Sequence, residues 1–268
     1  MPALNLPMSR PDTLLLNSKS SLRFKQMRLA LDASGARRTH TLLLGEKLVM
    51  EWLEASDGTA KDRFLPVRWL RLEGCGMHPI ERELPLETWE LKENLMRAIS
   101  DTSSPPSMAL LAVLANEPSG QLSDRVIVPW GIQDPGNLGA ILRSAAAFGF
   151  QEVLLGPGCA DPFSPKALRG SMGAAFKISL RRLSESHFAD GRWVALDAGK
   201  GAMPICKVDL GGTLRLMVGS EGHGWQGVDL PKGCIRAKIP TSGVESLNAA
   251  VAVGIACYEA ARSQRGPK

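Results

Sequence analysis

Aromatic residues and potential metal ligands are scarce in this chain of 268 residues. Phe, Trp and Tyr together make up 5% of it, and there are only four His. No CxxC spacing occurs among the five cysteines, which are Cys75, Cys159, Cys206, Cys234 and Cys257. We therefore expect no metal site, and scattered reduced thiols in a reducing compartment such as the cytoplasm are the simplest account.

Long hydrophobic runs are missing as well. No apolar stretch reaches the roughly 18 residues of a membrane-spanning helix, so we expect no role in a membrane. Near the N-terminus only residues 14–16 form an apolar run, which is too short for a secretory signal. The basic, Ser-rich segment 8–25 leaves an organellar transit peptide open, but a flexible N-terminus over 1–17 is the preferred interpretation.

Charge is distributed unevenly along the chain. Residues 1–47 hold eight Lys and Arg against three Asp and Glu, whereas residues 48–120 hold seven against twelve. Residues 121–268 are basic again, with seventeen against twelve, and the whole chain carries a net charge of +5. A basic N-terminal end and a basic second half favour a polyanionic partner such as RNA.

Hydrophobic periodicity differs between the two halves of the chain. The first half predicts helices over 20–34, 46–56 and 87–100, and strands over 39–45, 64–72 and 109–114. The polar segment 116–124 is expected to be a linker. Beyond it, short strands alternate with helices expected over 137–149, 164–173 and 246–264. Ser164 is placed as the cap of the second of these helices, and Gly149 ends the first. Such alternation indicates a parallel α/β sheet.

Three segments of the second half lead from a strand into a turn or a helix. The first, QDPGNLGAILR (133–143), contains Asn137 as the expected helix cap and Arg143 inside the helix. The second, VGSEGHG (218–224), surrounds Glu221 with glycines, and the third, IPTSGVESLN (239–248), places Ser246 near a helix start. Each segment alone also fits an ordinary turn or cap. Ligands of open α/β sheets bind at the carboxyl ends of the strands, so these segments form the candidate site.

Taken together, the three segments resemble motifs 1, 2 and 3 of the SpoU/TrmH-type RNA ribose 2′-O-methyltransferases of the knotted SPOUT superfamily. The resemblance covers about 123–262, and 18–56 is more weakly similar to the accessory domain of that family. It implies a SPOUT methyltransferase domain over 125–268, with a parallel sheet and a deep trefoil knot. It also implies a smaller substrate-binding α/β domain over 18–115, similar to the L30e/L7Ae fold of RNA-binding ribosomal proteins.

The resemblance further implies S-adenosylmethionine as the cofactor and a homodimer as the assembly. By motif position, the cofactor contacts are Gly219, Ile239, Ser246 and Leu247. The catalytic side chains are Asn137, Arg143, Glu221, Ser246 and Asn248. In this family the Arg of motif 1 usually faces a site completed across the dimer. Because a guanidinium has no free acceptor, we expect Arg143 to position and electrostatically activate the ribose rather than to act as a base.

Two basic stretches are candidates for RNA phosphate contacts. The first contains Arg23, Lys25, Arg28, Arg37 and Arg38. The second contains Lys166, Arg169, Lys177, Arg181 and Arg182. Clustered Lys and Arg neutralise phosphates, although each stretch also fits a solvated face.

The favoured function is methylation of a ribose 2′-OH in structured RNA. Ribosomal RNA is preferred over transfer RNA, because SPKALRGSMGAAF (164–176) resembles ribosomal RNA members of the family. The alternatives are a tRNA 2′-O-methyltransferase and a non-catalytic RNA-binding or ribosome-assembly factor of the same fold. The Ser-Leu-Asn triplet (246–248) argues against a base-methylating enzyme, and the lack of GxGxxG spacing in the first segment argues against dinucleotide binding.

Overall fold

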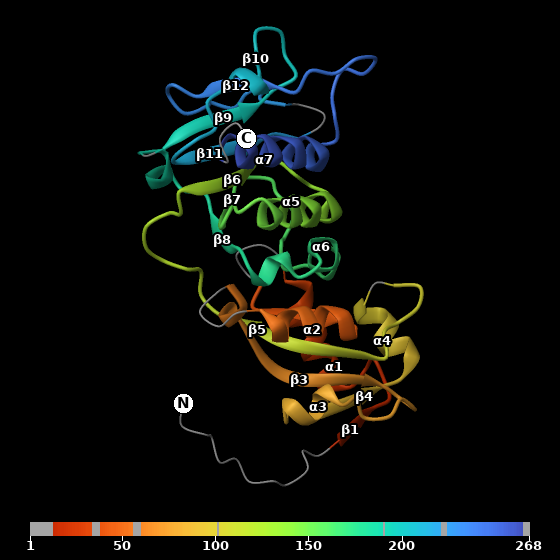
Figure 1. Cartoon of the computed structure of the whole chain (residues 1–268). Helices are drawn as coiled ribbons and strands as arrows, with labels where there is room; N and C mark the ends of the chain where they lie inside the picture. Colours follow the sequence, from red (N-terminus) through yellow and green to blue (C-terminus); the bar gives the residue numbers. More distant parts are fainter. Residues whose placement is uncertain are drawn as a thin grey trace. The chain divides into compact units, whose positions relative to one another are not determined.

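The computed structural model describes residues 13–33, 38–55, 60–100, 102–189, 191–220 and 224–264 (Figure 1). The chain divides into two compact units. The first comprises Met1–Val49 and Phe64–Leu114, and the second comprises Met50–Arg63 and Ala115–Lys268. None of the described helices is long and apolar enough to cross a membrane.

The first unit is built on a five-stranded mixed sheet in the order β1-β4-β3-β5-β2. Its strands are β1 (Thr13–Leu16), β2 (His40–Leu44), β3 (Phe64–Leu72), β4 (Thr88–Leu91) and β5 (Met108–Leu114). The helices of this part of the chain are α1 (Leu22–Asp32), α2 (Glu46–Glu54), η2 (Ala60–Arg63), α3 (Ile80–Glu83) and α4 (Glu93–Ser100). Strand β5 runs antiparallel to both its neighbours, whereas β4 is parallel to both of its own.

The expected helix over 87–100 is wrong in its first half. Residues Thr88–Leu91 form β4 between β1 and β3, and α4 begins only at Glu93. Trp89 and Leu91 are buried in the core of the first unit. Burial of an aromatic and an aliphatic side chain between two neighbouring strands outweighs the helical period of the sequence here.

The second unit contains a seven-stranded, fully parallel sheet in the order β10-β12-β9-β11-β6-β7-β8, which confirms the predicted parallel α/β architecture. Its strands are β6 (Arg125–Pro129), β7 (Glu152–Leu155), β8 (Ser179–Arg182), β9 (Arg192–Leu196), β10 (Met203–Pro204), β11 (Leu214–Val218) and β12 (Ile235–Lys238). Its helices are α5 (Pro135–Ala147), α6 (Pro165–Ser171) and α7 (Ala249–Gln264), with the short turns η3 (Ala174–Phe176), η4 (Glu185–Ala189) and η5 (Ile205–Lys207). In Figure 1, α5 and α7 lie side by side against this sheet.

The starts of the three helices depend on side-chain caps. Ser164 caps α6, as the sequence predicts, because its Oγ accepts a hydrogen bond from the N–H of Ala167 at 3.3 Å. Helix α5, however, is capped by Asp134 and not by Asn137. Helix α7 begins at Ala249, three residues later than expected, so Ser246 belongs to the preceding loop.

Two glycines set the approach of α5 to α6. A Cβ at Gly139 would lie 2.5 Å from the carbonyl oxygen of Ala167 and 2.9 Å from Cα of Gly170. The two helices can therefore pack backbone against backbone only because neither position carries a side chain. This packing fixes the helix of the first motif in the second unit.

Candidate active site and RNA interface

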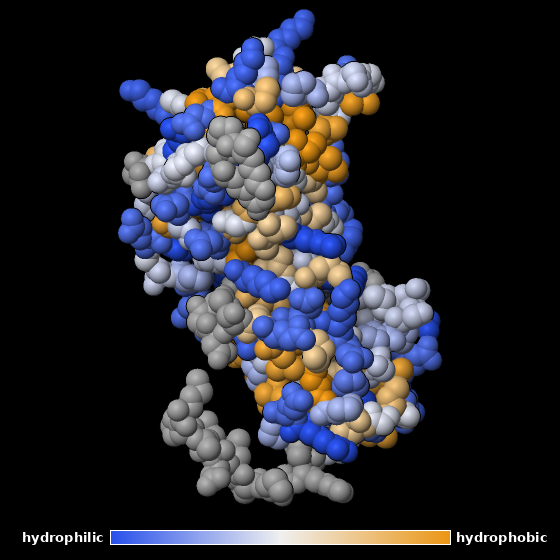
Figure 2. All heavy atoms as spheres, viewed as in Figure 1, coloured by the Kyte–Doolittle hydropathy of each residue, from blue (hydrophilic) through white to orange (hydrophobic). Residues whose placement is uncertain are grey.

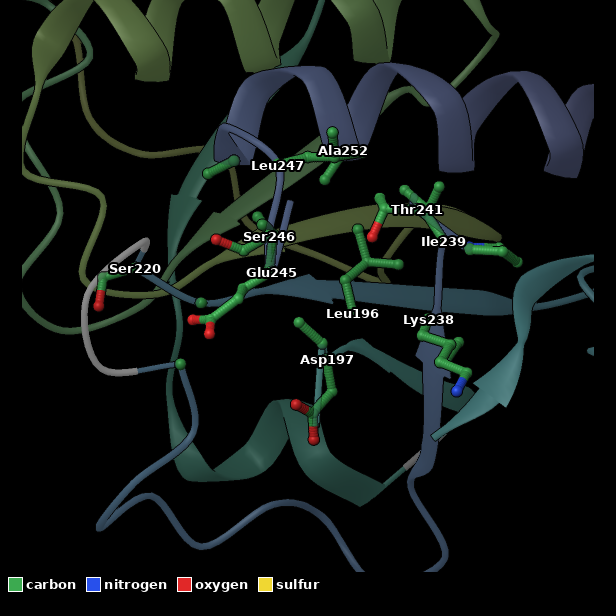
Figure 3. A pocket seen from close by; sticks show the side chains of 17 residues that line it. Leu196, Asp197, Ser220, Lys238, Ile239, Thr241, Glu245, Ser246, Leu247 and Ala252 are labelled. Atoms are coloured by element: carbon green, nitrogen blue, oxygen red, sulfur yellow. The ribbon is translucent and has the colours of Figure 1, made fainter. Parts of the chain in front are cut away.

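The loops at the carboxyl ends of β9, β11 and β12 surround one cavity of about 460 Å³ (Figure 3). Residues 196–198, 218–220, 237–241 and 245–247 contribute most of its wall. Gly219, Ile239, Ser246 and Leu247, the four residues expected to hold the cofactor, all line it. The carboxyl ends of parallel strands meet at one edge of a sheet, which brings together segments that are far apart in the sequence.

The turn of the second motif requires glycine. A Cβ at Gly219 would lie 2.8 Å from the carbonyl oxygen of Gly224, and Ser220 pairs with Gly224 in an isolated antiparallel bridge. The buried Trp225 follows, and its Nε1 donates a hydrogen bond to the carbonyl oxygen of Leu196 at 2.7 Å. This bond ties the residue after the second motif to the end of β9, so two walls of the cavity are fixed to one another.

Three charged side chains line the cavity within the described residues, and they differ in their partners. Asp197 Oδ2 accepts a hydrogen bond from Arg236 Nη1 at 2.9 Å, and its Oδ1 accepts one from a backbone N–H at 2.8 Å. Lys238 and Glu245 form no hydrogen bond or ion pair with any residue that the structure describes. In Figure 3 the carboxylate of Glu245 points toward the side of Ser220, whereas the ammonium of Lys238 lies on the other side of the cavity.

A second cavity, of about 600 Å³, adjoins the first, because Ser220, Gly224 and Ala249 line both. Asn137 lines this second cavity. The rest of its wall comprises Trp130, Gly131, Ile132, Gln133, Asp134, Pro157, Gly158, Gln226 and Val228. Sequence reasoning missed Trp130 and Gln226, although each lies within three residues of a motif.

Motifs 1 and 3 are joined by a hydrogen bond between two asparagines. Nδ2 of Asn248 donates to Oδ1 of Asn137 at 3.1 Å. The Oδ1 of Asn248 accepts from the N–H groups of Ala250 and Val251 at 3.0 and 3.3 Å, so Asn248 caps α7. One side chain thus orders the start of α7 and holds it to the start of α5.

Asp134 connects motif 1 to α6. Its Oδ2 lies 2.6 Å from Nζ of Lys166, and its Oδ1 accepts from the N–H of Asn137 at 2.8 Å. The hydrogen bond from Lys166, followed by the one from the Asn137 amide, lowers the pKa of Asp134. The carboxylate therefore stays ionised, and it links the start of α5 to Lys166 on α6.

One expected catalytic residue, Arg143, lies away from both cavities. Arg143 is exposed on α5, lines neither cavity and forms no ion pair with a described residue. Glu221 lies outside the described residues. Ser246 lines the first cavity, and Asn137 and Asn248 lie at the starts of their helices.

The first basic stretch is partly engaged within its own unit. Arg23 and Lys25 are exposed on α1, and Arg28 forms an ion pair with Asp32 at 3.0 Å and a hydrogen bond with the carbonyl oxygen of Ala98. The half-buried Arg38 donates to the carbonyl oxygen of His40 at 3.3 Å. Arg37 lies outside the described residues.

The second basic stretch contains one residue that is wrong as an RNA contact. Arg181 is buried, pairs with the fully buried Glu152 and donates to the carbonyl oxygen of Gly120 at 2.8 Å. Its charge is used inside the unit, because a buried charge requires a partner. Lys166 is exposed on α6, whereas Arg169 on the same helix is half-buried.

Potential metal ligands and thiols are scattered in the described part of the chain. It contains no group of three or more His, Cys, Asp or Glu that could hold a metal ion. The five cysteines are free thiols, of which Cys206 is exposed and Cys257 is buried.

Comparison with known sequences places this site in a family. Residues 124–258 match the SpoU rRNA methylase family. The 23S rRNA (guanosine(2553)-2′-O)-methyltransferase RlmP of Bacillus subtilis is 31% identical over 228 residues, which cover 82% of this chain and 88% of the relative. The 23S rRNA (guanosine-2′-O-)-methyltransferase RlmB of Coxiella burnetii is 34% identical over 166 residues, which cover 59% and 65% of the two chains.

Solved structures agree with this result. A crystal structure of an RNA 2′-O ribose methyltransferase has a TM-score of 0.72 at 26% identity, covering 94% of this chain and 100% of that one. The SpoU methyltransferase AviRb from Streptomyces viridochromogenes, in complex with AdoMet, shares the fold with a TM-score of 0.74 at 21% identity, covering 92% of this chain and 100% of that one. Fold and site together define a methyltransferase with a parallel α/β sheet. The chain belongs to the SpoU rRNA methylase family.

Proposed function

We propose that this protein transfers the methyl group of S-adenosylmethionine to a ribose 2′-OH of ribosomal RNA. One observation carries the proposal: the four expected cofactor residues line one cavity, and Asn137 lines a second cavity that shares a wall with it. The turn at Gly219, which leaves no room for a Cβ, suits a cofactor held close to the backbone. The related enzymes RlmP and RlmB, both named for 23S rRNA, favour ribosomal RNA over transfer RNA.

The reaction needs alignment and a path for one proton. A ribose 2′-OH is a weak nucleophile, and its proton passes to surrounding water as its oxygen attacks the methyl carbon. When bound, S-adenosylmethionine supplies a methyl group that leaves a sulfonium, whose S–C bond breaks as the new O–C bond forms. We assign Asn137 and Asn248 to holding the loops of the two cavities in place through their hydrogen bond. Ser246, which lines the first cavity, is assigned to binding the cofactor. Glu221 is assigned to holding the substrate and the motif loops.

Arg143 is assigned to positioning the ribose and stabilising the charge that develops on its oxygen. Its place outside both cavities supports a homodimer in which a second copy completes the site. Val251 and Tyr258 on α7 are exposed large hydrophobic residues, at 51% and 53%. In Figure 2 the surface over α5 and α7 shows mainly white and pale orange residues, which suits contact with a second copy.

We further infer the trefoil knot and the RNA-binding role of the first unit. In the sheet, β9 lies between β12 and β11, and β11 lies between β9 and β6. This strand order fits a chain that threads through its own loop. The exposed Arg23 and Lys25 of the first unit, and Lys166 and Arg169 of the second, are the candidate phosphate contacts. An RNA substrate and free thiols support a cytoplasmic location.

Methyl transfer tests the proposed function directly. Radiolabelled S-adenosylmethionine is incubated with the full chain and unmodified ribosomal RNA or, separately, transfer RNA, and the products are digested to nucleosides. We expect label in a 2′-O-methylnucleoside of ribosomal RNA. Label in transfer RNA would favour the tRNA enzyme, and label on a base would contradict ribose chemistry. Cofactor binding without transfer to free RNA or ribosomal particles would favour a non-catalytic assembly factor.

A further inference from the structure

The charged groups of the cofactor cavity are unequal in their effect on a bound ligand. Asp197 is paired with Arg236, so the charges of these two groups largely cancel. Glu245 has no such partner among the described residues, and it lines the cavity next to Ser246. Figure 3 shows its carboxylate directed to the same side of the cavity as the Ser246 hydroxyl, away from Lys238.

The ligands of this cavity differ by one charge. S-adenosylmethionine carries a positive sulfonium, whereas its demethylated product, S-adenosylhomocysteine, has a neutral thioether at the same place. The amino and carboxylate groups are common to both molecules. An uncompensated carboxylate therefore attracts the cofactor more strongly than the product, while its effect on the shared groups cancels from the comparison.

We propose that Glu245 is a specificity-determining residue, whose carboxylate makes the cavity prefer S-adenosylmethionine over S-adenosylhomocysteine. This inference rests on the proposed function, because it takes the cavity as the cofactor site. Its consequence is that the product formed in each turnover competes less with fresh cofactor. The residue lies outside the five assigned catalytic positions, and it directly precedes the Ser-Leu-Asn triplet.

Binding by itself tests the proposal, without any RNA. Isothermal titration of the full chain with each ligand gives the ratio of the Kd of S-adenosylhomocysteine to that of S-adenosylmethionine. We expect Glu245→Gln to lower this ratio about threefold, within the range for a solvent-exposed charge pair, because only S-adenosylmethionine loses an attraction to its sulfonium. Glu245→Asp keeps the charge and should retain most of the ratio. High salt should lower the native ratio and leave that of Glu245→Gln nearly unchanged.

Glu185→Gln is the matched control, since it removes the same charge from an exposed position that lines neither cavity. Its ratio should equal that of the native chain. An unchanged ratio in Glu245→Gln would overturn the proposal. An equal loss of affinity for both ligands would also overturn it, because Glu245 would then only shape its loop. If the native chain binds neither ligand, the cofactor assignment itself falls, and the role of Glu245 falls with it.

Discussion

The side chain of Asn248 hydrogen-bonds Asn137 across 111 positions of sequence, with Nδ2 and Oδ1 3.1 Å apart. The same amide caps α7 through its oxygen. Asn248 therefore holds the start of α7 next to the start of α5. Since Asn137 lines the second cavity and Ser246 the first, this bond sets how the two cavities face each other.

Replacing Asn248 by Asp should separate its two roles. The Asp side chain keeps an oxygen to cap α7, so the free energy of unfolding should change by less than about 1 kcal/mol. It cannot donate to Asn137, so we expect at least a tenfold loss of kcat. Asn248→Ala should lose both, with about 1 kcal/mol of stability. Thermal unfolding and single-turnover methylation measure the two effects, and native turnover in Asn248→Asp would exclude a functional role for the bond.

Arg143→Lys should lower kcat by about 100-fold, because a lysine keeps the charge but not the bidentate geometry of the guanidinium. The Kd for S-adenosylmethionine should stay unchanged, since Arg143 lines neither cavity. Turnover at saturating RNA, combined with cofactor titration, distinguishes the two parameters. Near-normal turnover of Arg143→Lys would contradict the proposal that the planar guanidinium positions the ribose.

Gly139→Ala should destabilise the protein by about 1–3 kcal/mol, because its Cβ would overlap the backbone of α6 at Ala167 and Gly170. Gly254→Ala on α7 is the control, since its Cβ would meet only Ser144 Oγ at an ordinary 3.5 Å. There the better helix propensity of alanine should stabilise by up to about 1 kcal/mol. Denaturant unfolding of both variants checks the opposite signs, and equal effects would contradict close packing of α5 on α6.

Thiol labelling should distinguish Cys257 from Cys206. Burial, which outweighs the nearby charge of Arg125, raises the pKa of Cys257 to about 12, while Cys206 is exposed. A thiol reagent should modify Cys206 rapidly at neutral pH and Cys257 only when the chain unfolds. Mass spectrometry of a labelling time course reports both rates. Equal rates in the native protein would contradict the burial of Cys257.

The same shift predicts a loss of stability in alkali. The folded state keeps the Cys257 proton up to a pKa of about 12, whereas the unfolded chain releases it near the ordinary thiol value. The contribution of the protonated Cys257 to the free energy of unfolding is therefore complete below that ordinary value, and it declines as the pH rises toward 12. Denaturant midpoints measured across this range should fall for the native chain and fall less steeply for Cys257→Ala.

The sequence by itself determined the parallel sheet of the second unit and, through its three motifs, four residues of the first cavity. Short buried strands alternating with helices leave few other arrangements, and the carboxyl ends of parallel strands meet at one edge. The resemblance of the motifs to the family, and not the periodicity, implied Gly219, Ile239, Ser246 and Leu247 as cofactor contacts, and all four line one cavity. The cap at Ser164 could be predicted too, since capping depends on residues only a few positions apart.

Only the tertiary structure decided features that depend on distant partners. Residues 88–91 pair as a strand because β1 and β3 flank them, which their own period does not reveal. Arg181 can be buried because it forms an ion pair with Glu152, although the basic sequence around it predicts an exposed surface. The Asn137–Asn248 bond, and the lack of a partner for Glu245 among the described residues, follow only from how the loops meet in space. Helical periods and caps are local, whereas burial and charge pairing are set by the whole fold.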